Sequence, residues 1–146
     1  HPPEDEELEV LRSTTAIQDA RVERAVTGAE LLSFQRLVRR VPVSEPVMRY
    51  ALSLVRASRR QGAATIDFIE KWVAYGASVR AAQYLVLGAK ARALVHGRYH
   101  VSFEDVRALA HPVMRHRVLT NFHAESEGVT TDQIIDRLIA AVPVPW

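Results

Sequence analysis

The segment from Ser78 to about His96 constrains the fold most strongly, because small and apolar residues occupy nearly every face of its helical pattern. A helix that is apolar all round is stable only when neighbouring elements surround it. The segment therefore predicts the central helix of a small bundle. Gly97 follows at the position where a glycine commonly ends a helix.

The rest of the chain predicts further helices around this central one. Apolar residues recur with a helical period after three capping sequences of the S/T-x-x-E type or a close variant, which begin at Thr27, Ser102 and Thr130. Ser44 is placed to cap another helix. Pro112 is expected to kink or end the helix that follows Ser102. The predicted fold class is all-α, with at most a minimal two-stranded sheet formed by "VPV" (41–43) and "YHV" (99–101).

Composition narrows the class of protein. The 146 residues suit one domain of ordinary size, and 48% hydrophobic with 25% charged residues is typical of a soluble globular protein. No apolar run reaches the roughly 20 residues that span a bilayer. The absence of cysteine excludes disulfides, thiolate metal sites and a cysteine nucleophile. The acidic N-terminal sequence lacks the order of a signal peptide, so a cytoplasmic location is expected.

Arg80 is the strongest candidate for a functional site residue. Ser78 is the expected N-cap, which places Arg80 second in the helix, where a cation is disfavoured by about 0.3–1 kcal/mol. Free N–H groups, a hydroxyl and a guanidinium at one point would bind phosphate. From the residues alone, the alternative is an arginine that pairs with a carboxylate or extends into solvent.

Other polar groups give weaker signals. His96 and His100 have the i, i+4 spacing of metal ligands, but Gly97 separates them and further ligands are lacking, so no metal site is expected. The sequence "RHR" (115–117) closes a helix, where cations complement the helix dipole. Five arginines at helix ends predict a basic patch, which leaves a stand-alone helical nucleic-acid-binding module as the alternative function: Arg39, Arg40, Arg56, Arg59 and Arg60. A protein-binding helical adaptor is a third possibility.

Four short sequences stand in an order that resembles the C-terminal region of MoxR-family AAA+ ATPases. They are "GASVRA" (76–81), "GRYHV" (97–101), "SFEDV" (102–106) and "PVMRHR" (112–117). The family often has proline where this chain has Val79, and the stretch before residue 76 differs from some members in a way that indicates a subfamily.

The resemblance implies an AAA+ helical lid without its nucleotide-binding core. Residues 1–24 would be a junction helix after the absent ATPase core, 25–117 the lid domain and 118–146 a C-terminal helical extension. Arg80 falls on the family's sensor-2 position, the catalytic lid arginine near the ATP γ-phosphate. Gly76, Ala77 and Ser78 would help to bind the nucleotide. The chain contains neither a Walker A nor a Walker B motif, so this segment alone is expected to be inactive.

The resemblance also implies cofactors and partners. ATP and Mg²⁺ are expected in the full-length protein, and no cofactor is expected in this segment. The expected partners are its own N-terminal ATPase core, further copies in a ring hexamer and a von Willebrand A-domain protein. The implied function is chaperone-like remodelling or maturation of partner proteins. Neither a membrane nor a nucleic-acid partner is implied, and the sequence does not indicate the client.

Overall fold

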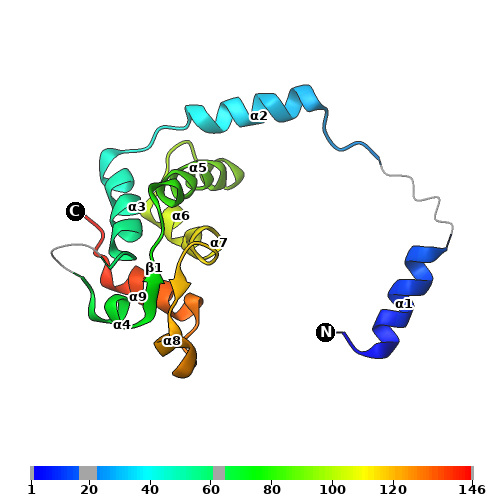
Figure 1. The fold of residues 1–146 in the computed structure, drawn as a ribbon. Helices are drawn as coiled ribbons and strands as arrows, with labels where there is room; N and C mark the ends of the chain where they lie inside the picture. The colour runs from blue at the N-terminus through cyan, green and yellow to red at the C-terminus, as the bar shows by residue number, and fades with distance from the viewer. Residues whose placement is uncertain (1, 17–22, 61–64, 146) are drawn as a thin grey trace. The chain divides into compact units, whose positions relative to one another are not determined.

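The computed structural model describes residues 2–16, 23–60 and 65–145 (Figure 1). The chain divides into two compact units, His1–Leu32 and Ser33–Trp146. Helix α2 (Gly28–Arg40) begins in the first unit and continues in the second.

The first unit contains α1 (Glu4–Thr15) and the start of α2. Four acidic residues occupy the first turn of α1, where they complement the positive end of the helix dipole. All residues of α1 are exposed, including the apolar residues Leu8 and Leu11. The predicted Thr27 capping box is confirmed, because Thr27 N–H donates to Glu30 (2.7 Å) and Glu30 N–H donates to Thr27 Oγ1 (3.1 Å). Residues 17–22, between α1 and α2, lie outside the described residues.

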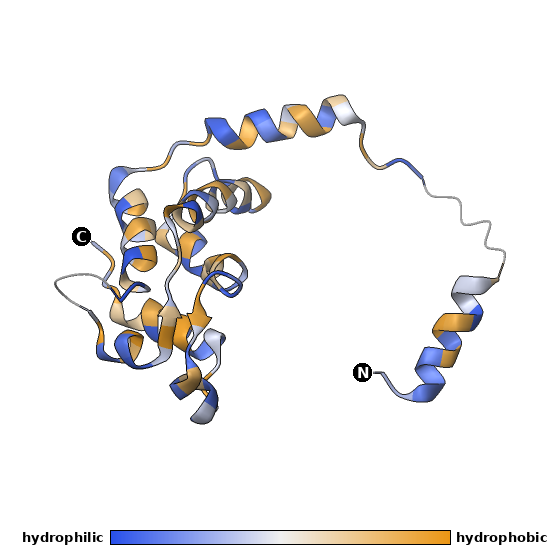
Figure 2. Ribbon diagram, viewed as in Figure 1, coloured by the Kyte–Doolittle hydropathy of each residue, from blue (hydrophilic) through white to orange (hydrophobic). Residues whose placement is uncertain are grey.

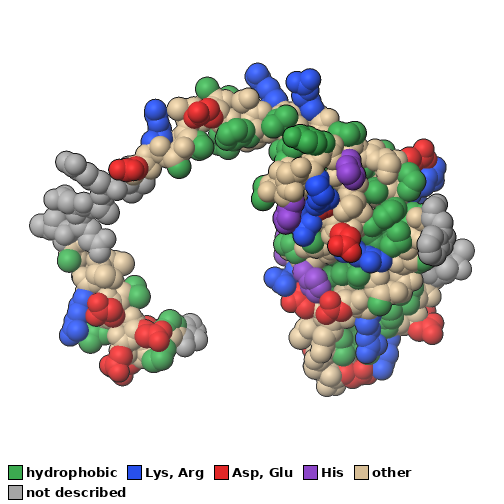
Figure 3. Space-filling view, turned by 180° about the vertical axis from the view of Figure 1, so that it is seen from behind, with side chains coloured by type: hydrophobic (Ala, Val, Ile, Leu, Met, Phe, Trp, Pro, Cys, Tyr) green, Lys and Arg blue, Asp and Glu red, His purple; other side chains and the backbone are tan. Residues whose placement is uncertain are grey.

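Helix α2 is amphipathic, as its apolar period predicts, yet its apolar side is open. Leu31, Phe34 and Leu37 are each about half exposed, and Val38 is half-buried. Polar and apolar residues alternate along the helix (Figure 2), and apolar side chains lie on its visible surface in the space-filling view (Figure 3). Among the helices that the structure describes, none combines the length and the apolar character needed to cross a bilayer.

The second unit is a helical bundle, which confirms the all-α prediction. After the end of α2 it contains seven helices in its described residues: α3 (Glu45–Ala57), α4 (Asp67–Trp72), α5 (Val79–Val95), α6 (Phe103–Ala108), α7 (Ala110–Met114), α8 (Phe122–Ser126) and α9 (Thr131–Ala141). Helix α5 is central, as expected, since it packs against α3, α6 and α7. It buries mainly alanines, and such small residues let neighbouring helices approach closely: Ala81, Ala82, Leu85, Ala89 and Ala93.

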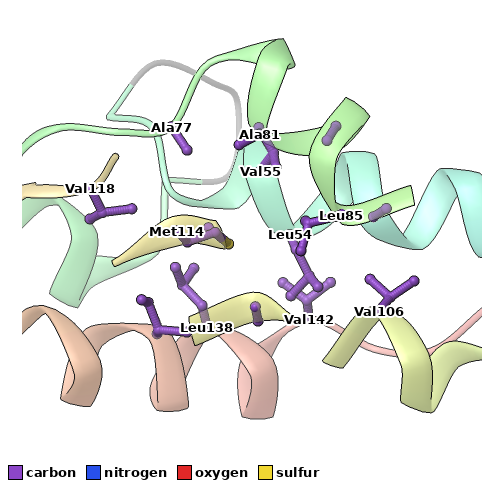
Figure 4. Close-up of a cluster of buried hydrophobic side chains, with 14 of the residues drawn as sticks. Leu54, Val55, Ala77, Ala81, Leu85, Val106, Met114, Val118, Leu138 and Val142 are labelled. Atoms are coloured by element: carbon purple, nitrogen blue, oxygen red, sulfur yellow. The ribbon is translucent and has the colours of Figure 1, made fainter. Parts of the chain in front are cut away.

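The hydrophobic core joins all these helices at the centre of the unit. Figure 4 shows Leu54 of α3, Leu85 of α5 and Met114 of α7 pointing into one cluster. Leu138 of α9 completes it from the opposite side, and all four side chains are almost fully buried. The last helix is therefore part of the same core as α3 and α5.

The small sheet forms from different residues than predicted. Strands β1 (Val73–Tyr75) and β2 (Leu119–Thr120) pair antiparallel, with Val73 opposite Thr120 and Tyr75 opposite Leu119. The assignment of strands to 41–43 and 99–101 was wrong, although a minimal two-stranded sheet is present. The β-branched residues Val41 and Val101 of those segments instead insert into the core from connectors.

Helix ends follow the predicted signals closely. The capping boxes at Ser102 and Thr130 are both present. Gly97 ends α5 with a φ angle of 68°, a conformation that only glycine adopts without strain. Its N–H donates to the Leu94 carbonyl (2.9 Å), while Arg98 N–H donates to the Ala93 carbonyl (2.8 Å). These two bonds make a Schellman motif, which satisfies carbonyls at the end of the central helix.

Pro112 interrupts the helix about one turn before its own position in the sequence. The helix after Ser102 breaks at Leu109, between α6 and α7, and Pro112 lies in the first turn of α7. Proline lacks an N–H group and its ring collides with the carbonyl four residues before it, here Ala108. A continuous helix would therefore be interrupted at this point, and the chain restarts the helix so that proline occupies a tolerated early position.

Candidate functional site

The candidate site lies where the loop 76–78 leads from β1 into α5. Ser78 is the N-cap with extended backbone angles, and Arg80 is the second helical residue, as predicted. The Ser78 side chain makes no capping hydrogen bond to any described residue, while its carbonyl accepts the Ala81 N–H (2.9 Å). The hydroxyl of Ser78 therefore leaves the first N–H groups of α5 open to another acceptor.

The Arg80 side chain is exposed, and within residues 2–16, 23–60 and 65–145 it makes no hydrogen bond or ion pair. The alternative that Arg80 pairs with a carboxylate is thus not realised in this part of the chain. The guanidinium remains free for an anion from outside it. The positive end of the α5 dipole adds to the attraction for such an anion.

Arg80 lines an open groove of about 660 Å³ that runs along α5. Three cations line it, Arg39, Arg80 and Lys90, and its described lining residues include no acid. Lys90 Nζ donates to the Arg39 carbonyl (3.0 Å), which fixes the end of α2 to α5. Lys90 lies ten residues beyond Arg80, about 15 Å along the helix axis. The groove therefore carries positive charge at Arg80 and again at Arg39 and Lys90, with uncharged residues of α5 between them.

Two consecutive residues at the end of α3 hold the loop that precedes Arg80. Ala77 N–H donates to Ser58 Oγ (2.9 Å), and Arg59 Nε–H donates to the Ala77 carbonyl (2.8 Å). Ser58 Oγ–H donates to the Val55 carbonyl (2.7 Å), and Ser58 is fully buried. Ala77 therefore has no free backbone donor to offer a ligand. Sequence reasoning missed Ser58 and placed Arg59 in a basic patch, because these bonds join residues 18 and 19 positions apart.

Gly76 lies close to the backbone of Ser58 and Arg59, just after the end of α3. A Cβ atom added there would lie 2.3 Å from the Ser58 carbonyl oxygen, far inside contact distance. We expect Gly76→Ala to lower the free energy of unfolding by about 1–3 kcal/mol, as overpacking usually does. Urea unfolding of the chain measures the effect. Gly28→Ala is the matched control, since nothing lies within 4 Å of a Cβ there, and an equal loss in both variants would contradict the close contact.

The sequences "GRYHV" and "SFEDV" meet in a buried ion-pair cluster around Asp105. Arg98 donates to both carboxylate oxygens of Asp105 (2.6 and 2.7 Å), and Arg92 donates to one of them (2.6 Å). Ser102 N–H also donates to the carboxylate (2.9 Å). The Arg98 hydrogen bonds hold the pKa of the fully buried Asp105 far below its usual range. The sequence predicted the capping box but not the two arginines, because Arg92 and Arg98 lie 13 and 7 residues before Asp105.

The histidine pair has separate surroundings. His96 is the C-cap of α5, with Nδ1 2.9 Å from the Arg92 carbonyl oxygen, and His100 lies beyond the helix. Among the described residues, no three His, Asp or Glu side chains lie together in a position to hold a metal ion.

The predicted basic patch does not form as one surface. Arg39 lines the groove beside α5, Arg56 lines a hollow with Pro143, and Arg59 lines a third with Gly76. The reason is geometric: α2 ends near the start of α3, whereas Arg56 and Arg59 lie near its other end, about 18 Å away by the rise of the helix.

The arginines of "RHR" have local roles at the end of α7. Arg115 donates to Asp132 of α9 (2.7 Å), and Arg117 stacks over the ring of Tyr84 at 5.0 Å. Asp132 also lies 3.3 Å from His111 Nδ1. These contacts join α7 to α9 and to α5, which agrees with a structural function for this segment.

Comparison with known proteins places this geometry in a family. Residues 68–138 match the family model described as the AAA lid domain. The chain is 26% identical to "Chaperone MoxR1" of Mycobacterium tuberculosis over 145 residues, 99% of this chain and 38% of that protein. It is 33% identical to "Protein MoxR" of Paracoccus denitrificans over 107 residues, 70% of this chain and 32% of that protein.

A solved structure agrees with the sequence matches. A Cytophaga hutchinsonii protein, provisionally assigned as an ATPase, superposes on the whole chain with a TM-score of 0.82 and 31% identity. The chain covers 44% of that protein, so it spans less than half the length of each of these relatives. The chain therefore carries the lid region of the MoxR-family AAA+ ATPases.

Proposed function

We propose that this chain is the lid of an ATP-hydrolysing AAA+ protein and that Arg80 is its sensor-2 arginine. In the full-length protein, ATP and Mg²⁺ would be held mainly by the ATPase core, and the Arg80 guanidinium would contact the γ-phosphate. One observation carries the proposal: Arg80 is exposed at the start of α5, in a groove whose lining charges are all positive, and has no acidic partner among the described residues.

The chemistry of a guanidinium suits this role. It presents several N–H donors in a planar fork that matches two phosphate oxygens, and such charge-assisted bonds are among the strongest in proteins. In phosphoryl transfer, negative charge is spread over the γ-phosphate oxygens, where a fixed arginine stabilises it. The open N–H groups at the start of α5 would add to the positive potential on the same side.

The same contact would couple the lid to the state of the nucleotide. ATP has a γ-phosphate and ADP lacks one, so Arg80 can favour a closed lid only when ATP is bound. A ligand shifts a conformational equilibrium only by its difference in affinity for the two states. The Arg80–phosphate bond supplies that difference, and the rigid core behind α5 transmits it to the rest of the bundle.

For the whole protein, we propose the organisation that the family implies. Residues 1–24 would follow the ATPase core, 25–117 would form the lid, and 118–146 would extend it. The assembly would be a ring hexamer that remodels or matures partner proteins, in the manner of a chaperone, with a von Willebrand A-domain protein as one partner. The name of the Mycobacterium tuberculosis relative, a chaperone, supports the chaperone-like function in this proposal.

Nucleotide discrimination tests the proposal. We expect Arg80→Ala in the full-length protein to weaken binding of a non-hydrolysable ATP analogue by about tenfold or more, the value of one charge-assisted hydrogen bond. ADP affinity should stay unchanged, because ADP lacks the phosphate in question. Isothermal titration of both nucleotides measures the two affinities. Arg36→Ala, which removes an exposed arginine of α2, is the control. Equal weakening for ADP and the ATP analogue would contradict a γ-phosphate contact.

A further inference from the structure

We propose that Ser58 and Arg59 are positioning residues for Arg80: together they fix the backbone of Ala77 and so set where the arginine stands. The inference rests on the proposed function of Arg80 and extends it to the end of α3. Neither residue reaches the groove that Arg80 lines. Their effect on a ligand must therefore pass through the loop and the first turn of α5.

Hydrogen bonds to the backbone of Ala77 hold the loop in place. A serine hydroxyl has one proton to donate, and Ser58 Oγ–H gives it to the Val55 carbonyl (2.7 Å). The hydroxyl oxygen can then only accept from Ala77 N–H (2.9 Å). Arg59 binds the carbonyl of the same residue (2.8 Å). Both backbone polar groups of Ala77 are thus held by two adjacent residues of one helix end.

Burial makes this arrangement rigid. Ser58 is 0% and Ala77 1% exposed, so water cannot replace the hydroxyl without opening the core. A Cβ atom at Gly76 would lie only 2.3 Å from the Ser58 carbonyl oxygen, so little room is left for the loop to move toward the end of α3. The loop is therefore clamped both by hydrogen bonds and by contact.

The clamp reaches Arg80 through one helical turn. Ala77 and Ala81 lie on either side of Arg80 in the sequence, and both side chains are buried in the same core (Figure 4). The Ala81 N–H donates to the Ser78 carbonyl (2.9 Å), which closes the turn between them. The Arg80 backbone is consequently anchored on both sides, while its side chain extends outward. A ligand oxygen would therefore contact a guanidinium whose backbone is held in a fixed position.

A double-mutant cycle in the full-length ATPase tests the proposal. Ser58→Ala and Arg59→Ala are each made alone and combined with Arg80→Ala, and kcat and KM for ATP are measured. We expect each single change to lower kcat about tenfold or more, since small displacements of a catalytic group have effects of this size. In the Arg80→Ala background, neither change should lower kcat further. A merely structural role would not produce this dependence on Arg80.

Matched controls separate positioning from folding. Ser53→Ala and Arg56→Ala remove exposed residues of the same two types from α3 and should leave kcat unchanged. Arg59→Ala removes one of the two bonds to Ala77 from a partly exposed residue, so it remains informative if Ser58→Ala fails to fold.

The outcomes are distinct. If Arg80→Ala lowers kcat and the effects of Ser58→Ala and Arg59→Ala add to it independently, positioning is overturned and the function of Arg80 stands. If Arg80→Ala leaves kcat unchanged, both the proposed function and the positioning role are overturned.

Discussion

Arg80→Ala in the full-length protein is expected to lower ATP turnover roughly a hundredfold or more, the usual effect of removing one preorganised donor from a charged transition state. The stability of the lid should not change, because the Arg80 side chain is exposed and has no hydrogen-bond partner among the described residues. Steady-state kcat at saturating Mg·ATP measures the first effect. The thermal unfolding midpoint of the chain measures the second.

Two further variants show whether turnover depends on the charge of Arg80, on its planar fork or on any exposed arginine. Arg80→Lys keeps the charge and loses the planar fork, so its kcat should fall between those of the wild type and the alanine variant. Arg36→Ala should leave turnover unchanged. Unchanged turnover in Arg80→Ala would show that the arginine has no part in hydrolysis. A large drop in its unfolding midpoint would show instead that Arg80 supports the fold.

Asp105→Ala is expected to cause the largest loss of stability, about 3–5 kcal/mol, because it breaks a buried ion pair and leaves its partners uncompensated. The carboxylate is fully buried and accepts hydrogen bonds from Arg98, Arg92 and the Ser102 backbone. At roughly 4 °C for each kcal/mol, the unfolding midpoint should fall by about 12–20 °C. Differential scanning calorimetry of the chain measures the change.

Asp132→Ala is the matched control for Asp105→Ala. Asp132 also accepts a hydrogen bond from an arginine, Arg115, but its side chain is 45% exposed. Exposed ion pairs contribute little to stability, so this variant should unfold close to the wild type. Equal losses in the two variants would contradict the claim that burial makes the Asp105 cluster important.

The Asp105 cluster also predicts the response to acid. Hydrogen bonds from Arg98 lower the pKa of Asp105 in the folded state, so the folded protein holds the proton less tightly than the unfolded chain, whose carboxyl pKa is about 3.9. The stabilisation is therefore complete above that value and is lost as the pH falls below it. The difference in stability between wild type and Asp105→Asn should shrink below about pH 4.

Local sequence patterns predicted most of the helical framework. The central helix followed from the apolar residues around its whole surface, and its end followed from Gly97, since both depend on neighbouring residues. The capping boxes at Thr27, Ser102 and Thr130 were predictable for the same reason. Each of these signals lies within the helix that it specifies or directly beside it.

Features that join distant segments were not predictable in this way. Strands β1 and β2 have three and two residues, too few for an alternating pattern, and their pairing depends on the packing of helices between them. The hydrogen bond between Ser58 and Ala77 likewise depends on the packing of segments that are distant in the sequence. Arg80 was predictable as a candidate because its place in the helix is local, but its lack of an acidic partner among the described residues required the structure.

The most direct test of the account is a structure of the full-length protein with Mg²⁺ and a non-hydrolysable ATP analogue. The distance to measure joins the Arg80 guanidinium nitrogens and the γ-phosphate oxygens. We expect hydrogen bonds of about 2.7–2.9 Å. An Arg80 side chain that instead pairs with a carboxylate of the ATPase core, or extends into solvent in the closed ring, would contradict the assignment.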